Sequence, residues 1–321
     1  MPSTAATHAF KGPYEMVRAA QIARLFYFER HSKVHISGLL GISRFDVARL
    51  LDLARASGMV QIAVNEPGSL DVDLSAALCH RFGLHHAVVV RSRAADDVES
   101  REQIGRAAAD LLSEICGPED VIGIGWARIV LAMAEHVHDL KARRIVQVTG
   151  ALTRPDVDAS APEVVRKVAR RVGAESSVFY APMLVSDAQT ALGLYRQEQV
   201  ATAVAHFGSV TKAIVGVGGW DPPHSTLYDA LTPQERLAMT RSGVFVDLAG
   251  VLLDVDGQDI QTPLSDRIIA ITAQQLARVP EVIGLAYGVD KVPAARAALR
   301  GGYLQGLVTH TAFAEALLSA S

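Results

Sequence analysis

The stretch Ile36-Ser-Gly-Leu-Leu-Gly-Ile-Ser-Arg44, continued by Phe45-Asp-Val-Ala-Arg-Leu-Leu51, decides the fold of the N-terminal region. A short apolar helix over Val34–Leu40 is interrupted by Gly41, and Ser43 stands where an N-cap accepts a backbone N–H bond. The next helix is therefore expected over Arg44–Ala56. Helical apolar spacing predicts another helix before this pair, over Tyr14–Phe28. Helix, glycine turn and capped helix together predict a helix-turn-helix.

The predicted recognition helix offers groups suited to DNA. Its inward positions are apolar, and its first turn starts with a hydroxyl, a guanidinium and an aromatic ring. Ser43 is expected to contact phosphate, Arg44 to read a guanine edge, and Arg49 to support backbone or base contact. The predicted DNA-binding residues are Ser43, Arg44, Phe45 and Arg49. The alternative is a three-helix interaction or dimerisation module with a solvated Arg face.

A strand over Met59–Val64 would make this a winged helix-turn-helix. The turn-rich segment Asn65-Glu-Pro-Gly68 then predicts a boundary between a DNA-binding domain, 1–65, and an effector and oligomerisation domain, 66–321. The first 65 residues hold eight Lys and Arg against four Asp and Glu, although the whole chain has a net charge of −3. This charge asymmetry is the one expected for an appended polyanion-binding module.

Composition predicts a globular cytoplasmic protein. Half of the 321 residues are hydrophobic and 20% are charged, which suits about two packed domains. No apolar run approaches the roughly 20 residues that span a bilayer, and the N-terminus lacks a signal-peptide core. Cys79 and Cys116 lack metal-ligand spacing and are expected to be buried thiols. The histidines show no metal spacing either, so neither a metal nor a cofactor is predicted.

The rest of the chain alternates strand-like runs with amphipathic helices, which predicts a doubly wound parallel sheet of the Rossmann-like α/β type. Ligands in such sheets bind outside the carboxyl ends of the strands. The expected helices are 101–115, 129–138, 161–172 and 292–299. The expected strands are 86–91, 121–125, 144–148, 177–180, 213–217, 282–286 and 304–308.

Three glycine-containing turns follow predicted strands. Gly123-Ile-Gly125-Trp-Ala-Arg128 leads into a helix whose free N–H groups could hold an anion. Gly216–Gly219 ends another strand, and Tyr287-Gly-Val-Asp-Lys291 again joins strand to helix. Tight packing is the alternative explanation for each turn. Their shared edge of the sheet predicts ligand contacts from Gly123, Gly125, Trp126, Arg128, Gly218, Gly288 and Lys291.

Carboxylates in the segment 243–271, expected to be irregular, suit hydroxyl recognition because each accepts several hydrogen bonds. Asp247 and Asp266 are predicted ligand contacts, and Asp254 is a weaker candidate. Turn chemistry is the alternative, since Asp256-Gly257 is typical of a hairpin turn and Asp266 could cap a helix.

Six blocks, in order, resemble the SorC family of DeoR-type sugar-binding regulators over almost the whole chain. Besides the helix-turn-helix they are Val121–Trp126, Ala181–Val185, Val215–Gly219, Pro263–Arg267, Val279–Gly284 and Lys291–Gly302.

The resemblance implies a transcriptional regulator of a sugar or polyol operon that binds double-stranded operator DNA and a sugar, polyol or sugar-phosphate effector. It also implies an effector domain related in fold to ribose-5-phosphate isomerase and glucosamine-6-phosphate deaminase, and a homodimer or homotetramer. Thr149 and Gly150 join the implied pocket, with Asp247, Gly288, Lys291 and the turn Gly125–Ile129.

The chain departs from the family pattern at the implied pocket. Ala127 and Ile129 stand where the family usually has Gly and Thr, and Tyr287-Gly288 replaces a Gly-Gly pair. Ile129 offers no hydrogen bond, so an unphosphorylated polyol becomes a credible effector. The remaining alternative is a sugar-phosphate isomerase or deaminase, in which Asp247 and Lys291 would act as acid and base.

Overall fold

The computed structural model describes residues 10–61, 68–91, 97–152, 160–220 and 225–319. The chain divides into two compact units, Met1–Asn65 and Glu66–Ser321, and each is described by itself.

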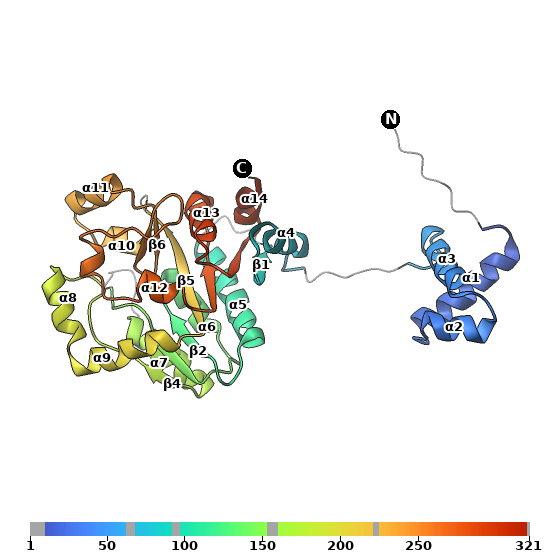
Figure 1. Ribbon diagram of the computed structural model, residues 1–321, viewed down its shortest axis with the longest axis horizontal. Coiled ribbons are helices and arrows are strands. Elements are labelled where there is room, and N and C mark those ends of the chain that lie inside the picture. Colours follow the sequence, from blue (N-terminus) through green and yellow to red (C-terminus); the bar gives the residue numbers. More distant parts are fainter. Residues whose placement is uncertain (1–9, 62–67, 92–96, 153–159, 221–224, 320–321) are drawn as a thin grey trace. The chain divides into compact units, whose positions relative to one another are not determined.

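The N-terminal unit contains α1 (Pro13–Tyr27), α2 (Lys33–Leu40) and α3 (Arg44–Ala56) (Figure 1). Their apolar faces meet in a core that includes the fully buried Ile22, Ile36 and Leu51. Gly41 has φ +60°, a left-handed conformation that favours glycine. The Ser43 hydroxyl accepts the Asp46 N–H at 3.0 Å. The helices and the glycine turn are therefore consistent with the predicted helix-turn-helix, and α3 has the predicted bounds.

The predicted wing strand is not seen in the part of the chain that the structure describes. Met59–Gln61 has no strand, because Val60 turns back to donate its N–H to the Ala54 carbonyl at 2.9 Å and packs on the helical core. Ile62–Val64 lie outside the described residues, as does most of the predicted linker.

The second unit is built on a parallel sheet with the strand order β1-β9-β8-β5-β2-β3-β4. From β2 the chain winds outward through β3 to β4, and from β5 it winds the other way through β8 to β9. β1, which precedes β2 in the chain, lies at the edge of the sheet beside β9. The winding reverses between β2 and β5. The strands are β1 (His86–Val90), β2 (Val121–Ile124), β3 (Arg144–Gln147), β4 (Glu175–Ser177), β5 (Lys212–Gly219), β8 (Glu281–Leu285) and β9 (Gly306–His310).

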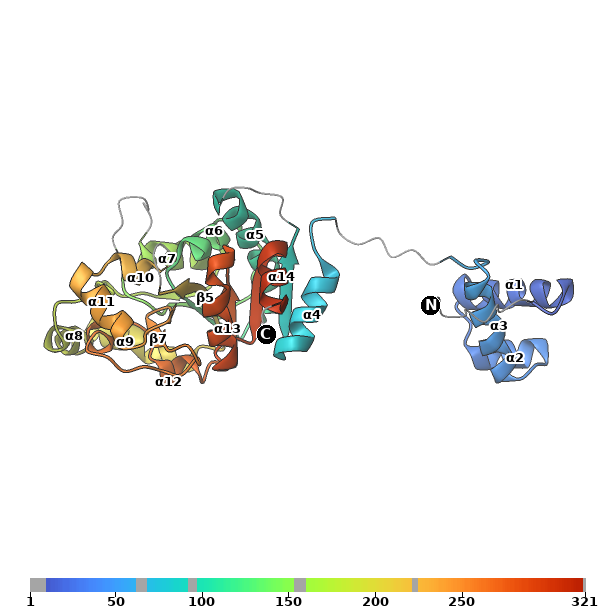
Figure 2. The ribbon, with the colours of Figure 1, turned by 90° about the horizontal axis from the view of Figure 1, so that it is seen from above.

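Alternating side chains bury both faces of this sheet. Val215 and Val217 point into one core and Ile214 into the other, as a period of two requires. Figure 2 shows the resulting layers of helices on the two sides of β5. One core is covered by α5 (Asp97–Ile115), α6 (Arg128–His136) and α7 (Ala161–Val172). The other is covered by α4 (Val72–Phe82), α8 (Ala188–Tyr195), α9 (Glu198–Val204), α12 (Ala273–Leu276), α13 (Val292–Arg300) and α14 (Thr311–Ser319).

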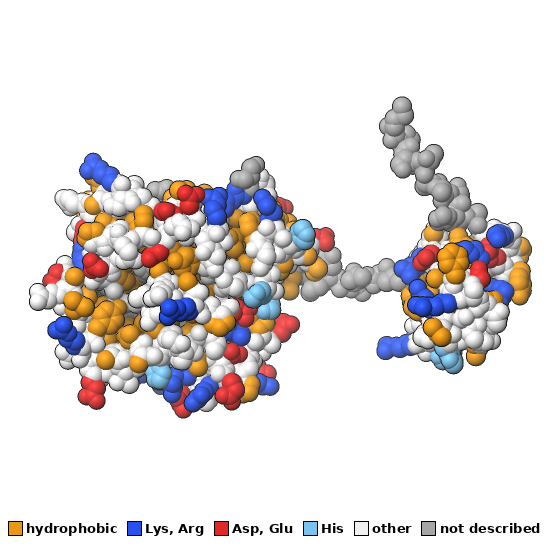
Figure 3. All heavy atoms as spheres, in the orientation of Figure 1, with side chains coloured by type: hydrophobic (Ala, Val, Ile, Leu, Met, Phe, Trp, Pro, Cys, Tyr) orange, Lys and Arg blue, Asp and Glu red, His pale blue; other side chains and the backbone are white. Residues whose placement is uncertain are grey.

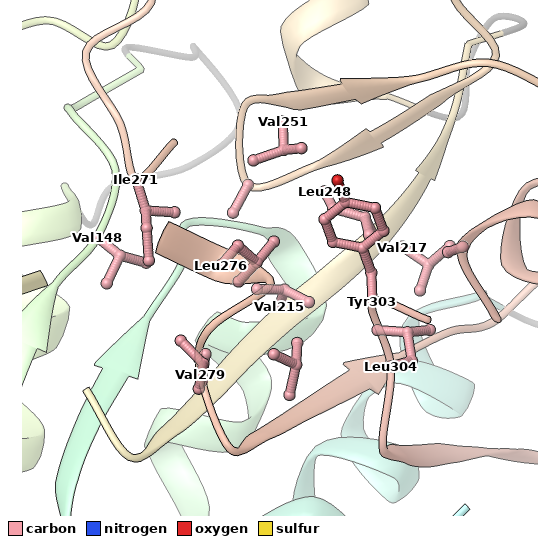
Figure 4. Packing of buried hydrophobic residues seen from close by; sticks show 14 of the residues in the cluster. Val148, Val215, Val217, Leu248, Val251, Ile271, Leu276, Val279, Tyr303 and Leu304 are labelled. Carbon is pink, nitrogen blue, oxygen red and sulfur yellow. The ribbon is translucent and has the colours of Figure 1, made fainter. Parts of the chain in front are cut away.

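A β-hairpin occupies the segment expected to be irregular, which corrects the sequence prediction. β6 (Val246–Leu248) pairs antiparallel with the end of β5 and with β7 (Val251–Leu253). Figure 4 shows Leu248 and Val251 packed in the same core as Val215 and Val217 of β5. Asp247 therefore lies in a strand, opposite Gly218.

Next to this hairpin, α10 (Thr226–Asp229) and α11 (Pro233–Arg241) pack in a smaller core. Asp266 lies in the 3-10 turn η2 (Ser265–Arg267), so it is not a helix cap. Asp254 is a turn residue, because its Oδ1 accepts the N–H groups of Asp256 and Gln258. The other 3-10 turns are η1 (Ala205–Ser209) and η3 (Val289–Lys291).

Some predicted strand bounds were wrong. The strand expected over 177–180 ends at Ser177, because the Phe179 N–H bonds the Gln147 side chain and not a neighbouring strand. β9 begins two residues later than expected, at Gly306. Cys116 is buried as predicted, whereas Cys79 is only half-buried.

Candidate functional site

The outer face of α3 carries the side chains that were predicted to contact DNA. Arg44 is exposed and the Phe45 side chain is 78% exposed, although Phe is usually buried. The Ser43 hydroxyl is held at the helix start by Asp46, with the two side-chain oxygens 2.6 Å apart. Figure 3 shows basic and hydrophobic side chains together on the visible surface of this unit.

Arg49 is placed differently from Arg44. Its guanidinium donates to Glu15 of α1 at 2.9 Å and lies 3.8 Å from Asp46. The Lys11 N–H and Arg49 both bond Glu15 and hold its pKa below the usual value. Arg49 therefore fastens α1 to α3, and its charge is shared with two carboxylates. Arg55 is also exposed, three turns after Arg44, and its Nη2 lies 3.8 Å from Asp52. A spacing of 11 residues places Arg44 and Arg55 on one face of α3.

The second unit has a pocket at the carboxyl ends of β2, β5 and β8. This is where the winding of the sheet reverses, the position at which doubly wound folds bind ligands. Its walls come from the turn before α6, the end of β5, α10, the β6–β7 hairpin and η3. The lining residues are Trp126, Ala127, Arg128, Ile129, Leu152, Met183, Gly216, Val217, Gly218, Thr226, Leu227, Asp229, Asp247, Ala249, Leu285, Tyr287 and Lys291.

Charged groups of both signs line this pocket. Arg128 begins α6, and its Nη2 lies 3.9 Å from Oδ2 of Asp229 on α10. The Lys291 ammonium lies 4.0 Å from the centroid of the Tyr287 ring, a cation–π distance. An apolar wall of Leu152, Met183 and other side chains faces these groups. Such a mixture suits a polyhydroxylated molecule, which has both apolar C–H surface and hydroxyls.

Asp247 is held by the protein itself. Its Oδ2 accepts the Ser225 hydroxyl at 2.9 Å, and its Oδ1 accepts the Gly250 N–H at 2.9 Å. Burial raises the pKa of this carboxyl, and the two hydrogen bonds oppose the rise. Asp247 therefore joins α10 to the hairpin at the base of the pocket.

The pocket is narrow in this structure. The gap among its lining residues is ≈ 630 Å³ including the open mouth, but only ≈ 50 Å³ of it admits the centre of a water molecule. The pocket would therefore have to widen to admit a sugar.

Five of the predicted ligand residues meet in this pocket: Trp126, Arg128, Gly218, Asp247 and Lys291. The other six do not line it. Gly123 and Gly150 have packing roles, because a Cβ would lie 2.9 Å from Val148 and 2.6 Å from the Met183 backbone respectively. The buried Thr149 hydroxyl accepts the Trp126 N–H at 3.1 Å and thus shapes the turn before α6.

The remaining three predicted residues also lie behind or away from the lining. A Cβ on Gly125 would lie 3.1 Å from that of Ala249. Gly288 has φ +79° and lets the chain turn after β8. Asp266 is exposed in η2. Sequence reasoning missed Thr226 and Asp229, whose short helix is brought to the pocket by long-range packing.

Comparison with known proteins covers both units. Residues 67–319 match the family described as "Putative sugar-binding domain". The sorbitol operon regulator of Klebsiella pneumoniae is 27% identical over 303 residues, which cover 93% of this chain and 96% of that protein. The chain belongs to the SorC family of sugar-binding transcriptional regulators.

Other SorC-family comparisons agree. The transcriptional regulator LsrR of Klebsiella pneumoniae is 26% identical over 307 residues, covering 94% of this chain and 92% of that protein. The crystal structure of the full-length sorbitol operon regulator SorC from Klebsiella pneumoniae matches with a TM-score of 0.70 and 26% identity, over 96% of this chain and 100% of that chain. The prediction of a sugar-responsive transcriptional regulator is confirmed at this level.

The enzyme alternative is not favoured, because these SorC-family relatives are regulators. The two groups imagined as acid and base are also engaged: both Asp247 oxygens accept hydrogen bonds, and Lys291 lies over the Tyr287 ring. None of the helices in the described part of the chain is long and apolar enough to cross a membrane.

The family departures have a structural consequence at the turn before α6. The extra methyl group of Ala127 is accommodated by Gly216, where a Cβ would lie 2.6 Å from that of Ala127. Ile129 lines the pocket and is almost fully buried. The part of the pocket lining that Ile129 forms is therefore apolar.

Proposed function

We propose that α3 binds operator DNA through Ser43, Arg44 and Phe45, and that a carbohydrate-like effector in the pocket controls this binding. The observation that carries the DNA half is the capped α3 with Arg44 and Phe45 exposed on its outer face. A guanidinium at the start of a recognition helix can contact a guanine edge in the major groove. Arg49 acts as a positioning residue, through Glu15.

The effector half is supported by the pocket at the reversal point of the sheet and by its mixed polar and apolar lining. The ligand class is a sugar, polyol or sugar phosphate. In this proposal, the protein works as a homodimer or homotetramer on paired half-sites in the cytoplasm, and effector binding changes the subunit arrangement. Such a switch requires the effector to bind the two arrangements with different affinity.

The DNA half is tested with an operator selected from genomic fragments and binding measured by fluorescence anisotropy. Arg44→Ala should weaken binding by about 1–3 kcal/mol, and the salt dependence should show whether phosphate contacts are lost as well. Arg24→Ala is the matched control, because Arg24 is also an exposed helical arginine but lies on α1. Sedimentation should show that both variants keep the wild-type assembly.

Equal effects of Arg44→Ala and Arg24→Ala on DNA binding would contradict the assignment of α3. If Arg44→Ala dissociated the assembly instead, the N-terminal unit would be a dimerisation module. The effector half fails if every sugar or polyol that binds the full-length protein leaves operator affinity unchanged.

A further inference from the structure

The Asp229 carboxylate lies beside Arg128, one of the two cations that line the pocket. The carboxylate and the Arg128 guanidinium are 3.9 Å apart, and their side chains are only 27% and 29% exposed. Arg128 and the first turn of α6 would otherwise favour an anion. The Asp229 carboxylate therefore occupies the position to which Arg128 would attract a negatively charged group of a ligand.

The backbone that carries Asp229 is held in place, because α10 is tied at both ends. At its start, Ser225 accepts the Tyr228 N–H at 3.2 Å and donates to Asp247 at 2.9 Å. At its end, Arg236 donates to the backbone carbonyls of Tyr228 and Asp229 at 2.9 and 2.8 Å.

A second layer of packing supports this short helix. The Arg236 guanidinium lies 4.8 Å from the Tyr228 ring centroid, and the Tyr228 ring meets the buried Trp220 edge-on at 5.4 Å. The helix that brings Asp229 to the pocket lining is thus packed against its neighbours, and the Asp229 side chain is mostly buried.

From this arrangement we propose that Asp229 determines ligand specificity, so that the pocket selects an uncharged polyhydroxylated ligand and rejects a phosphorylated one. The inference rests on the proposed role of the pocket as the effector site. A hydroxyl both donates and accepts hydrogen bonds, so neighbouring hydroxyls can accept from Arg128 and donate to Asp229. A fully ionised phosphate at Arg128 has no proton to donate and can only accept hydrogen bonds. Its negative charge would also be repelled by the Asp229 carboxylate nearby.

The charges of the other lining residues also support this assignment. Asp247 adds a second carboxylate, and Ile129 offers no hydrogen bond. The two cations, Arg128 and Lys291, thus face two carboxylates among the lining residues of the described chain. The lining has no marked excess of positive charge to hold a dianion.

Inorganic phosphate is the probe that tests Asp229, with binding to the full-length protein measured by calorimetry at constant ionic strength. Asp229→Asn keeps the size of the side chain and removes its charge. The Asn variant should bind phosphate at least tenfold more tightly than the wild type. Arg128→Gln in the Asn background should abolish the gain, which separates this pocket from the cations of the helix-turn-helix. Circular dichroism and thermal unfolding check that each variant is folded.

Phosphate affinities within twofold of each other in the wild type and Asp229→Asn, including no detectable binding to either, would overturn the proposal. So would a gain that persists in the Arg128→Gln double variant. A sugar phosphate that binds the wild type more tightly than its unphosphorylated form would also overturn it. None of these results bears on operator binding by Arg44, so failure here is distinguishable from failure of the proposed regulatory function.

Discussion

Each end of the parallel sheet carries both positively and negatively charged side chains, but these side chains are packed differently at the two ends. At the amino end, Lys212 lies 3.4 Å from Asp120 and 3.6 Å from Glu281, and the His86 ring lies 3.0 Å from Glu281. At the carboxyl end, Arg128 and Asp229 are 3.9 Å apart at their closest. Both side chains line a pocket there. Charges that are packed together support folding, whereas charges held apart around a pocket can serve a ligand.

The degree of burial sharpens this contrast. The Lys212 and Glu281 side chains are 14% and 11% exposed, about half as much as Arg128 and Asp229. Asp120 also accepts hydrogen bonds from the Gly117 N–H at 2.8 Å and the Thr211 hydroxyl at 2.6 Å. Burial would raise the pKa of Asp120, but these bonds and Lys212 lower it overall.

The largest expected effect is a loss of stability, seen when one cation is replaced at either end in separate variants. Lys212→Met leaves the buried Glu281 and the half-buried Asp120 without their shared cation and should lower the free energy of unfolding by about 3–5 kcal/mol. Arg128→Met removes a more exposed and looser partner and should cost less than about 1 kcal/mol. Urea unfolding followed by tryptophan fluorescence measures both, because Trp126 and Trp220 lie in the second unit. Similar losses in the two variants would remove the distinction between the ends.

Asp247 tests whether a pocket residue can also be structural. Asp247→Ala leaves the Ser225 hydroxyl and the Gly250 N–H without their buried acceptor and should cost about 1–3 kcal/mol. Asp247→Asn keeps an acceptor and removes the buried charge, so it should cost less. Urea unfolding at neutral pH compares the two variants.

The same carboxyl predicts a pH dependence. Because its folded-state pKa is raised, the folded protein binds this proton more tightly than the unfolded chain does. The contribution of Asp247 to stability should therefore grow as pH falls from above the raised pKa towards the usual value, and Asp247→Asn should remove that contribution. An unchanged pH profile in the Asn variant would show that the group does not titrate as expected.

The sequence predicted the helix-turn-helix more closely than the pocket because its determinants are local. Gly41 and Ser43 fix the turn and the start of α3 within a few residues. Parallel strands with buried side chains were also visible as apolar runs, and their carboxyl ends correctly indicated the edge of the pocket.

The missed parts depend on distant contacts. The hairpin strands β6 and β7 have three residues each, and their turn contains Ala249 at φ +52° instead of the usual Asn or Gly. Asp229 reaches the pocket only because Arg236 and Ser225 hold α10 in place. Gly123 was predicted in an anion-binding turn, and Gly150 in the pocket that the family resemblance implies. Each instead makes room for a neighbouring side chain or backbone.

Replacing Glu235 should have a smaller effect on stability. The Thr232 hydroxyl, Arg267 and the Thr232 N–H all bond this carboxylate and lower its pKa to about 2. Its stabilising contribution is therefore present above the usual value of 4.5 and is lost as pH falls from there towards about 2. Glu235→Gln keeps a residue that suits a capping box but loses the ion pair, and should cost about 1 kcal/mol at neutral pH. Acid unfolding curves should converge for the two proteins at low pH, and a constant difference would contradict the assignment.

Labelling of cysteine thiols tests whether a reagent can reach each end of the sheet, and the substitutions it needs should change stability little. Burial raises the pKa of Cys116, beside the amino-end charges, to about 12, so almost no reactive thiolate forms at pH 8. In a Cys79→Ser background, Cys116 should react with a chromogenic disulfide reagent only when urea unfolds the protein. Adding Thr226→Cys places a thiol at a partly exposed position of the pocket lining, and this second thiol should react in the folded protein. Rapid labelling of Cys116 in the folded Cys79→Ser protein would mean that the amino end opens, and its packed charges would then no longer differ from those around the pocket.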